Sequence, residues 1–65
     1  MSLPNAPIER IIRKAGAERV SKEAVEELRD AVEDLGREVS ADAVKMAGQA
    51  ERNTVKEEDV DMATQ

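Results

Sequence analysis

The middle of the chain carries apolar residues at spacings of three and four, with polar and charged residues between them. This is the period of an α-helix with one buried face, and no proline interrupts it. The apolar positions are Ala24, Leu28, Ala31, Leu35, Val39, Ala43, Met46 and Ala50, widened by Val25, Val32, Val44 and Ala47. We therefore predict a single helix from Ser21 to about Ala50.

This predicted helix is too long for its own small chain to bury. A helix over residues 21–50 rises about 45 Å at roughly 1.5 Å per residue. A compact monomer of 65 residues has a diameter of only about 28 Å, judged from the scaling of the radius of gyration. We therefore expect the rest of the chain to cover part of the apolar stripe and a second copy to cover the remainder, as an obligate dimer.

A short helix is predicted ahead of the long one. Proline disrupts a helix interior but suits the first turn, so this helix is expected to start near Pro7. Its apolar side consists of Ile8, Ile11, Ile12 and Ala15. Gly16 suits the carboxyl cap, where a residue tolerant of positive φ is needed. After an extended stretch, Ser21 is predicted to cap the amino end of the long helix.

Beyond Ala50 the helical period breaks at residues 51–55, where β-branched Thr54 and Val55 favour a second extended loop. Three acids at residues 57–59 then suit the first turn of another short helix. The prediction is an all-α chain with a short helix, a loop, a long central helix, a loop and a short helix, in one domain over residues 1–65. Gly36 has two interpretations: a tolerated loss of helix propensity of about 1 kcal/mol, or a close approach where two long helices cross in the dimer.

Composition excludes several kinds of chemistry. Cysteine, histidine and aromatic residues are absent, so disulfides and the common zinc sites are excluded. The carboxylates have no accompanying nucleophile with a histidine and no glycine-rich phosphate loop, so we expect no enzyme, cofactor or metal site. The chain lacks a long apolar run, a signal peptide pattern and a basic amphipathic face, so we expect a soluble intracellular protein that does not bind membranes.

The formal charge of −5 argues against a polyanionic partner, but it is unevenly distributed. Residues 1–20 carry four basic and two acidic side chains, a net charge of +2. Residues 21–50 carry four basic and eight acidic side chains (−4), and residues 51–65 carry two basic and five acidic side chains (−3). The only segment with a net positive charge is therefore the amino-terminal one.

Two stretches connect this plan to a known family. Residues 3–21, LPNAPIERIIRKAGAERVS, and residues 51–63, ERNTVKEEDVDMA, resemble the first helix and loop, and the second loop and last helix, of the archaeal histones. The resemblance covers essentially the whole chain. It implies the histone fold as an intertwined homodimer, which wraps or compacts double-stranded DNA with little sequence specificity on the cytoplasmic chromosome, or nucleoid. It also implies association of dimers into tetramers or longer assemblies, and other histones as candidate partners.

The resemblance implies DNA-binding roles for five residues. Arg19 matches the loop arginine that enters the minor groove, with Thr54 beside it in the facing loop. Arg10, Arg13 and Lys56 match positions close to phosphates. For each of these side chains the alternative is an ordinary solvated surface residue.

Two further groups are implied to have structural roles. Arg52 and Asp59 match an internal ion pair that fixes the second loop against the last helix, a role we rank above DNA contact for Arg52. The contact between dimers would be lined by Met46, Gln49, Asp59 and Met62. The alternative for the two methionines is that they are ordinary core residues.

Departures from the family weaken the expected DNA affinity. Asn53 and Gly48 replace residues that are commonly basic, Glu51 replaces a glycine, and Gln49 replaces a frequent histidine. A second function therefore stays open, an acidic histone-fold dimerisation module with weak or no DNA binding. We favour DNA binding because the basic contact positions are retained, and because acids elsewhere are screened over about 8 Å at physiological salt.

Overall fold

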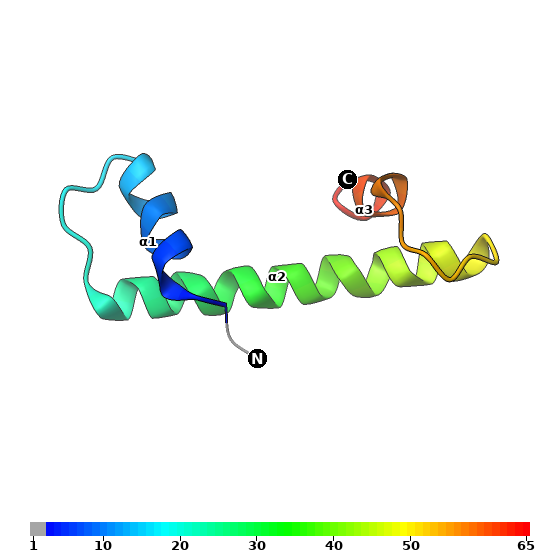
Figure 1. Cartoon of the computed structure of the whole chain (residues 1–65), viewed down its shortest axis with the longest axis horizontal. Helices are drawn as coiled ribbons and strands as arrows, with labels where there is room; N and C mark the ends of the chain where they lie inside the picture. The colour runs from blue at the N-terminus through cyan, green and yellow to red at the C-terminus, as the bar shows by residue number, and fades with distance from the viewer. Residues whose placement is uncertain (1–2) are drawn as a thin grey trace. The chain divides into compact units, whose positions relative to one another are not determined.

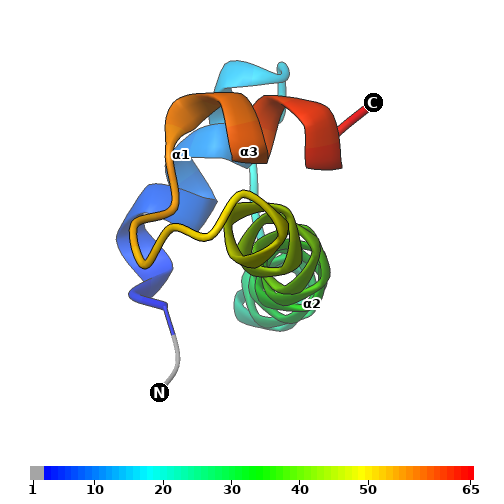
Figure 2. The ribbon, with the colours of Figure 1, turned by 90° about the vertical axis from the view of Figure 1, so that its right-hand side faces the viewer.

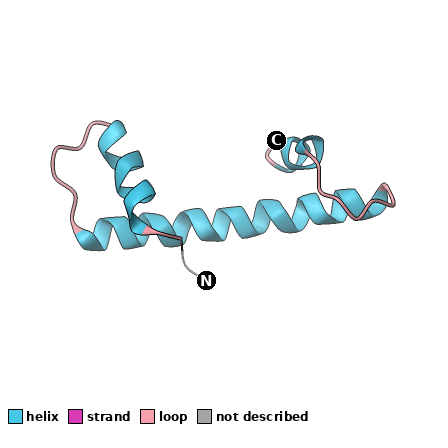
Figure 3. Ribbon diagram, in the orientation of Figure 1, coloured by secondary structure: helices cyan, strands magenta, loops and turns pink. Residues whose placement is uncertain are grey.

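The computed structural model describes residues 3–65, which form three helices joined by two loops (Figure 1). Helix α1 spans Asn5–Lys14, α2 spans Lys22–Gln49 and α3 spans Glu57–Ala63. Among these residues there is no strand (Figure 3). The predicted all-α order of a short, a long and a short helix is confirmed.

Helix α1 begins earlier than predicted. Pro4 is its N-cap, with an extended backbone at φ −66° and ψ 148°, and Asn5 is the first helical residue. The predicted start near Pro7 is therefore wrong by two residues. The physical reason is that the first four N–H groups of a helix have no partner within it, so proline is tolerated throughout the first turn.

Helix α2 runs without interruption for 28 residues, a length of about 42 Å at the usual rise. Ser21 precedes it, and the Ser21 Oγ accepts a hydrogen bond from the Ala24 N–H at 3.1 Å. This contact satisfies one of the unpaired N–H groups at the helix start, so the predicted N-cap is confirmed.

The contacts of the chain fall into two units that divide within α2, one up to Asp34 and one over Leu35–Gln65. In the first unit, α1 and the first part of α2 bury Ile8 and Val25, which are 3% and 4% exposed. The Asn5 side chain, at the start of α1, accepts a hydrogen bond from Arg29 Nη1 at 2.8 Å. These contacts hold α1 against α2.

In the second unit, residues 50–56 lead from the end of α2 to α3 (Figure 2). Ala43 and Ala47 of α2 are buried, at 0% and 2% exposure, and so is Asp59 of α3. The small alanine side chains contribute little apolar area, and an ion pair at Asp59, described below, completes the contact between α2, the loop and α3.

Much of the apolar stripe of α2 stays exposed in the single chain. Leu35 is 62% exposed and Val44 is 58% exposed, while Ile11 on α1 and Met62 on α3 are exposed by 53% and 59%. Burying such a side chain typically contributes about 1.5–3 kcal/mol, which these residues do not gain within one chain. The expectation that one chain covers only part of the stripe is confirmed, whereas the dimer stays a prediction.

Gly36 lies within this exposed part of α2. A Cβ atom placed on it would meet no other described atom within 4 Å. The single chain therefore contains no close backbone approach at Gly36, and a helix crossing at this position stays a prediction.

Candidate nucleic-acid interface

The first loop, residues 15–21, starts from a well-defined helix end. Gly16 has φ +117°, in the left-handed region that glycine adopts without steric cost. Its N–H donates to the Arg13 carbonyl at 3.0 Å, and the Ala17 N–H donates to the Ile12 carbonyl at 3.5 Å. These two bonds are a left-handed C-cap, so the predicted role of Gly16 as a cap is confirmed.

Arg13 connects α1 to this loop. Its Nε atom donates to the Glu9 carboxylate at 3.1 Å, one helical turn earlier. Its Nη1 atom donates to the Glu18 carbonyl oxygen at 3.1 Å. The acidic and basic side chains of the pair are about half exposed, at 46% and 49%. The guanidinium that was predicted to contact DNA is therefore engaged on two sides within its own chain.

Arg10 and Arg19 are placed differently. Both residues are exposed, and within residues 3–65 neither side chain forms a hydrogen bond or an ion pair; the same holds for Lys14 and Lys22. Four exposed cations without acidic partners therefore lie in residues 10–22. This segment retains its positive charge although the chain as a whole is acidic.

The second loop starts from the same kind of cap, made by a different residue. Glu51 has φ +59°, and its N–H donates to the Gly48 carbonyl at 2.9 Å. The Arg52 N–H donates to the Ala47 carbonyl, also at 2.9 Å. A left-handed conformation costs an L-residue about 1–2 kcal/mol relative to the right-handed one. The position that suits glycine geometrically is thus occupied by glutamate.

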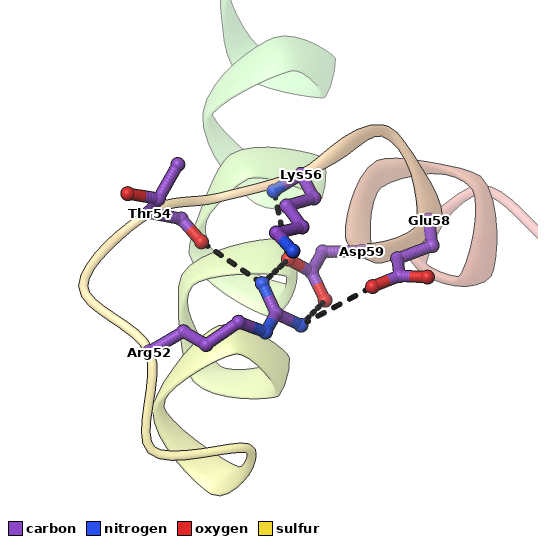
Figure 4. Close-up of polar contacts among 5 residues, drawn as sticks. All are labelled: Arg52, Thr54, Lys56, Glu58 and Asp59. Atoms are coloured by element: carbon purple, nitrogen blue, oxygen red, sulfur yellow. Dashed lines mark hydrogen bonds and ion pairs between the residues drawn. The ribbon is translucent and has the colours of Figure 1, made fainter.

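Arg52 and Asp59, which were predicted to pair, lie in a bidentate contact (Figure 4). Arg52 Nη2 is 2.8 Å from Asp59 Oδ1, and Arg52 Nη1 is 2.9 Å from Asp59 Oδ2. Arg52 Nη1 also donates to the Thr54 carbonyl oxygen at 2.9 Å. Such a planar, charge-assisted contact fixes direction as well as distance. It ties the loop to the first turn of α3.

Electrostatics at this pair follow from its geometry. Asp59 is only 5% exposed, and the hydrogen bonds from Arg52 and then from the Lys56 backbone N–H lower its pKa to about 2. The same carboxylate raises the pKa of Arg52 above its ordinary value. Hydrogen bonds to the charged form stabilise that form, so the pair stays ionised throughout the neutral range.

Thr54 and Lys56 are exposed residues on either side of this ion pair. The backbone of each is held, at Thr54 by Arg52 through its carbonyl oxygen and at Lys56 by Asp59 through its N–H, 2.8 Å from Oδ2. Lys56 is also the N-cap of α3. Its side chain carries no acceptor, so only the carboxylate half of a capping box forms here. Arg52 is therefore a support for two candidate DNA-contacting residues.

The residues predicted at the contact between dimers are distributed over α2 and α3. Met46 is half-buried, Gln49 is the exposed last residue of α2, and Met62 is 59% exposed. Asp59 is buried, and its carboxylate already accepts three hydrogen bonds within the chain. A carboxylate has about four acceptor positions, so little capacity remains for an amide from a neighbouring dimer.

Two features were missed from the sequence. The hydrogen bond between Asn5 and Arg29 joins residues 24 positions apart, and no local pattern relates them. The left-handed Glu51 gave a partial signal, because a break in the apolar period after α2 marks a helix end, where glycine is usual. Recognising the strain required the observed backbone angle.

Other kinds of site find no support in the described chain. Within residues 3–65, no group of three or more His, Cys, Asp or Glu side chains is placed to hold a metal ion. No helix there is long and apolar enough to cross a membrane. An open depression beside α3 is lined by Lys56 and three acids, Glu57, Glu58 and Asp61. The excess of acids makes it unfavourable for a phosphate group.

Three helices in the order short, long, short, with a capped and arginine-supported loop before and after the long helix, define a chain of the histone-fold class. The chain belongs to the family of histone-like transcription factors (CBF/NF-Y) and archaeal histones, whose model matches residues 1–64.

Two relatives support the same assignment. The chain is 52% identical over 61 residues to the archaeal histone HAN1 of Thermococcus zilligii, and the match covers 94% of this chain and 91% of that protein. It is 46% identical over 61 residues to the probable archaeal histone 3 of Methanocaldococcus jannaschii, with the same coverage.

Family membership confirms the predicted class of function. Archaeal histones are DNA-binding chromosomal proteins and not enzymes, so both predictions hold for this chain. The alternative of a dimerisation module with weak or no DNA binding is not favoured.

Proposed function

We propose that two copies of this chain form a homodimer through the exposed apolar faces of α2 and its flanking helices, and that the dimer bends duplex DNA around its surface. Arg10 and Lys56 contact phosphates, and Arg19 enters the minor groove with Thr54 beside it. Dimers further associate through the surface that includes Met46, Gln49 and Met62. The protein acts on the chromosome in the cytoplasm.

Incomplete burial supports the dimer. Leu35 and Val44 are more than half exposed in the single chain, and no large apolar side chain among residues 3–65 is fully buried. Ordering a residue costs on the order of 1–2 kcal/mol of backbone entropy, which so small a core does not offset in a chain of this length. A second copy of α2 supplies the missing apolar cover.

The observation that carries the DNA-binding mode is the group of exposed, unpaired cations around the first loop. Arg10 and Arg19 have no acidic partner among the described residues, unlike Arg13, Arg29 and Arg52. Long-range repulsion from the acids elsewhere decays over about 8 Å at physiological salt. DNA close to these cations is therefore attracted more strongly than the net charge of −5 suggests.

This mode of binding predicts weak sequence selectivity. Phosphate contacts position a protein on DNA without reading bases, and a minor-groove arginine reads groove width. Selectivity then arises from how easily a DNA segment bends.

The salt dependence of duplex binding tests the proposal. If three cations of each chain (Arg10, Arg19 and Lys56) neutralise phosphates in a dimer, log affinity should fall with log salt with a slope of about −5, since each phosphate contributes roughly −0.9. Arg19→Ala should weaken binding at constant dimer content. A matched control, Lys45→Ala, removes the same charge from the exposed surface of α2 away from the loops.

Three outcomes would count against the proposal. A slope near zero for the wild type would mean that no phosphates are neutralised. Equal losses of affinity for Arg19→Ala and Lys45→Ala would reduce Arg19 to a contributor of general charge. Well-folded single chains in sedimentation equilibrium at micromolar concentration would refute the dimer.

A further inference from the structure

We propose that Arg13 acts in DNA binding as a positioning residue for Arg19, and not as a phosphate ligand. This inference rests on the proposed function, because it assigns to Arg13 a task within the same interface. It changes the role that the position of Arg13 on the first helix implied.

Arg13 is attached to the peptide group that carries Arg19. Its Nη1 atom donates to the Glu18 carbonyl oxygen at 3.1 Å, and that carbonyl belongs to the peptide bond between Glu18 and Arg19. The planarity of the peptide bond couples this oxygen rigidly to the Arg19 backbone nitrogen. Holding the carbonyl therefore restricts the direction in which the Arg19 side chain leaves the loop.

The guanidinium is itself oriented from the other side. Glu9 accepts from Arg13 Nε at 3.1 Å, one turn earlier on α1. A planar guanidinium donates in two fixed directions at once, from Nε and from Nη1, which a lysine ammonium does not reproduce. The helix thus supports the loop through one side chain with two defined contacts.

The second loop contains the same device. Arg52 Nη1 donates to the Thr54 carbonyl at 2.9 Å while its guanidinium is held by Asp59. In both loops an arginine bound to a carboxylate holds a loop carbonyl next to a candidate DNA-contacting residue. The pair in the second loop is buried and the one in the first is exposed, so the contribution of Arg13 lies in the orientation of the loop and not in fold stability.

The decisive variant is Arg13→Lys, which keeps the charge and removes the two-directional contact. We expect it to weaken duplex binding about three- to tenfold, the effect of losing one hydrogen bond of modest strength, with an unchanged salt slope. In an Arg19→Ala background, Arg13→Lys should change affinity less than twofold, because nothing remains to be positioned. In the free protein, the ¹⁵N order parameter of the Arg19 amide should fall in Arg13→Lys, while Lys14→Arg serves as a matched control with no change.

The alternatives give different results. Wild-type affinity for Arg13→Lys, or losses that add fully in the double variant, would overturn the inference and leave Arg13 as a direct phosphate ligand. So would an Arg13→Gln variant whose salt slope is smaller than that of Arg13→Lys by about 0.9 per chain. If the wild type itself shows no salt-dependent binding, the proposed function fails, whereas the order-parameter measurement still tests the contact between Arg13 and the loop.

Discussion

Replacing Glu51 with glycine should stabilise the protein, because the backbone at this position has the geometry of a glycine C-cap. Glu51 has φ +59° and closes the end of α2 with two hydrogen bonds of 2.9 Å. The Cβ atom of an L-residue in this conformation crowds the neighbouring carbonyl oxygen. Glycine keeps both hydrogen bonds and removes the crowding.

The size of the effect can be estimated from two opposing terms. Relief of the left-handed conformation contributes about 1–2 kcal/mol, and the greater freedom of glycine in the unfolded chain opposes it by about 0.4–1 kcal/mol. The net stabilisation is therefore about 0.5–1 kcal/mol per chain. With an unfolding entropy of about 2.1 cal/mol/K per residue over 65 residues, this raises Tm by roughly 4–7 °C.

Thermal unfolding followed by circular dichroism measures this shift, with Glu51→Ala as the matched control. The alanine variant also removes an acid from the negative end of the α2 dipole, which contributes about 0.3–1 kcal/mol, but it keeps the unfavourable φ. The difference between the glycine and alanine variants isolates the backbone term. If Glu51→Gly melts no higher than Glu51→Ala, the left-handed cap does not store the strain that the backbone angle implies.

Two further perturbations test the dimer and the ion pair. Leu35→Asp should abolish the cooperative thermal transition, because a residue that is 62% exposed in one chain becomes buried in the proposed dimer, where an unpaired carboxylate is strongly unfavourable; Ser40→Asp adds the same charge at another exposed position of α2 and should fold, and a folded Leu35→Asp would contradict the dimer. Because pairing lowers the pKa of Asp59 from 3.8 to about 2, its contribution to stability is complete above about pH 4 and is lost as the pH falls toward 2. Thermal melts over this range should therefore decline more steeply for the wild type than for Asp59→Asn, and parallel curves would mean that Arg52 and Asp59 do not pair in solution.

The helical plan was predictable because it depends on local regularities. A period of three to four without proline is specific for a helix, and the structure places α2 at Lys22–Gln49, close to the predicted 21–50. The caps at Ser21 and Gly16 were predictable for the same reason, since each depends on a side chain or a φ angle at one position. The start of α1 was less certain because proline is tolerated at several positions of a first turn.

The candidate site was predictable in its members but not in their roles. Resemblance to the archaeal histones pointed to Arg13 as a phosphate contact, yet its guanidinium lies between Glu9 and the Glu18 carbonyl. An exposed arginine and an arginine engaged by its own loop have the same letter in a sequence. Only the folded loop distinguishes Arg13 from Arg19, which is exposed and has no partner among residues 3–65.

By itself, the sequence determined the helices, their order, the absence of a self-sufficient core and the family, because periodicity, caps and composition act over a few neighbouring residues. The tertiary structure decided which cations are already bound, that Asp59 is buried and ionised, and that Glu51 adopts a left-handed backbone. These properties depend on which atoms from distant or reversed segments of the chain come within hydrogen-bonding distance. Apolar spacing predicts that a face must be buried, but only atomic positions show which polar groups are satisfied when it is.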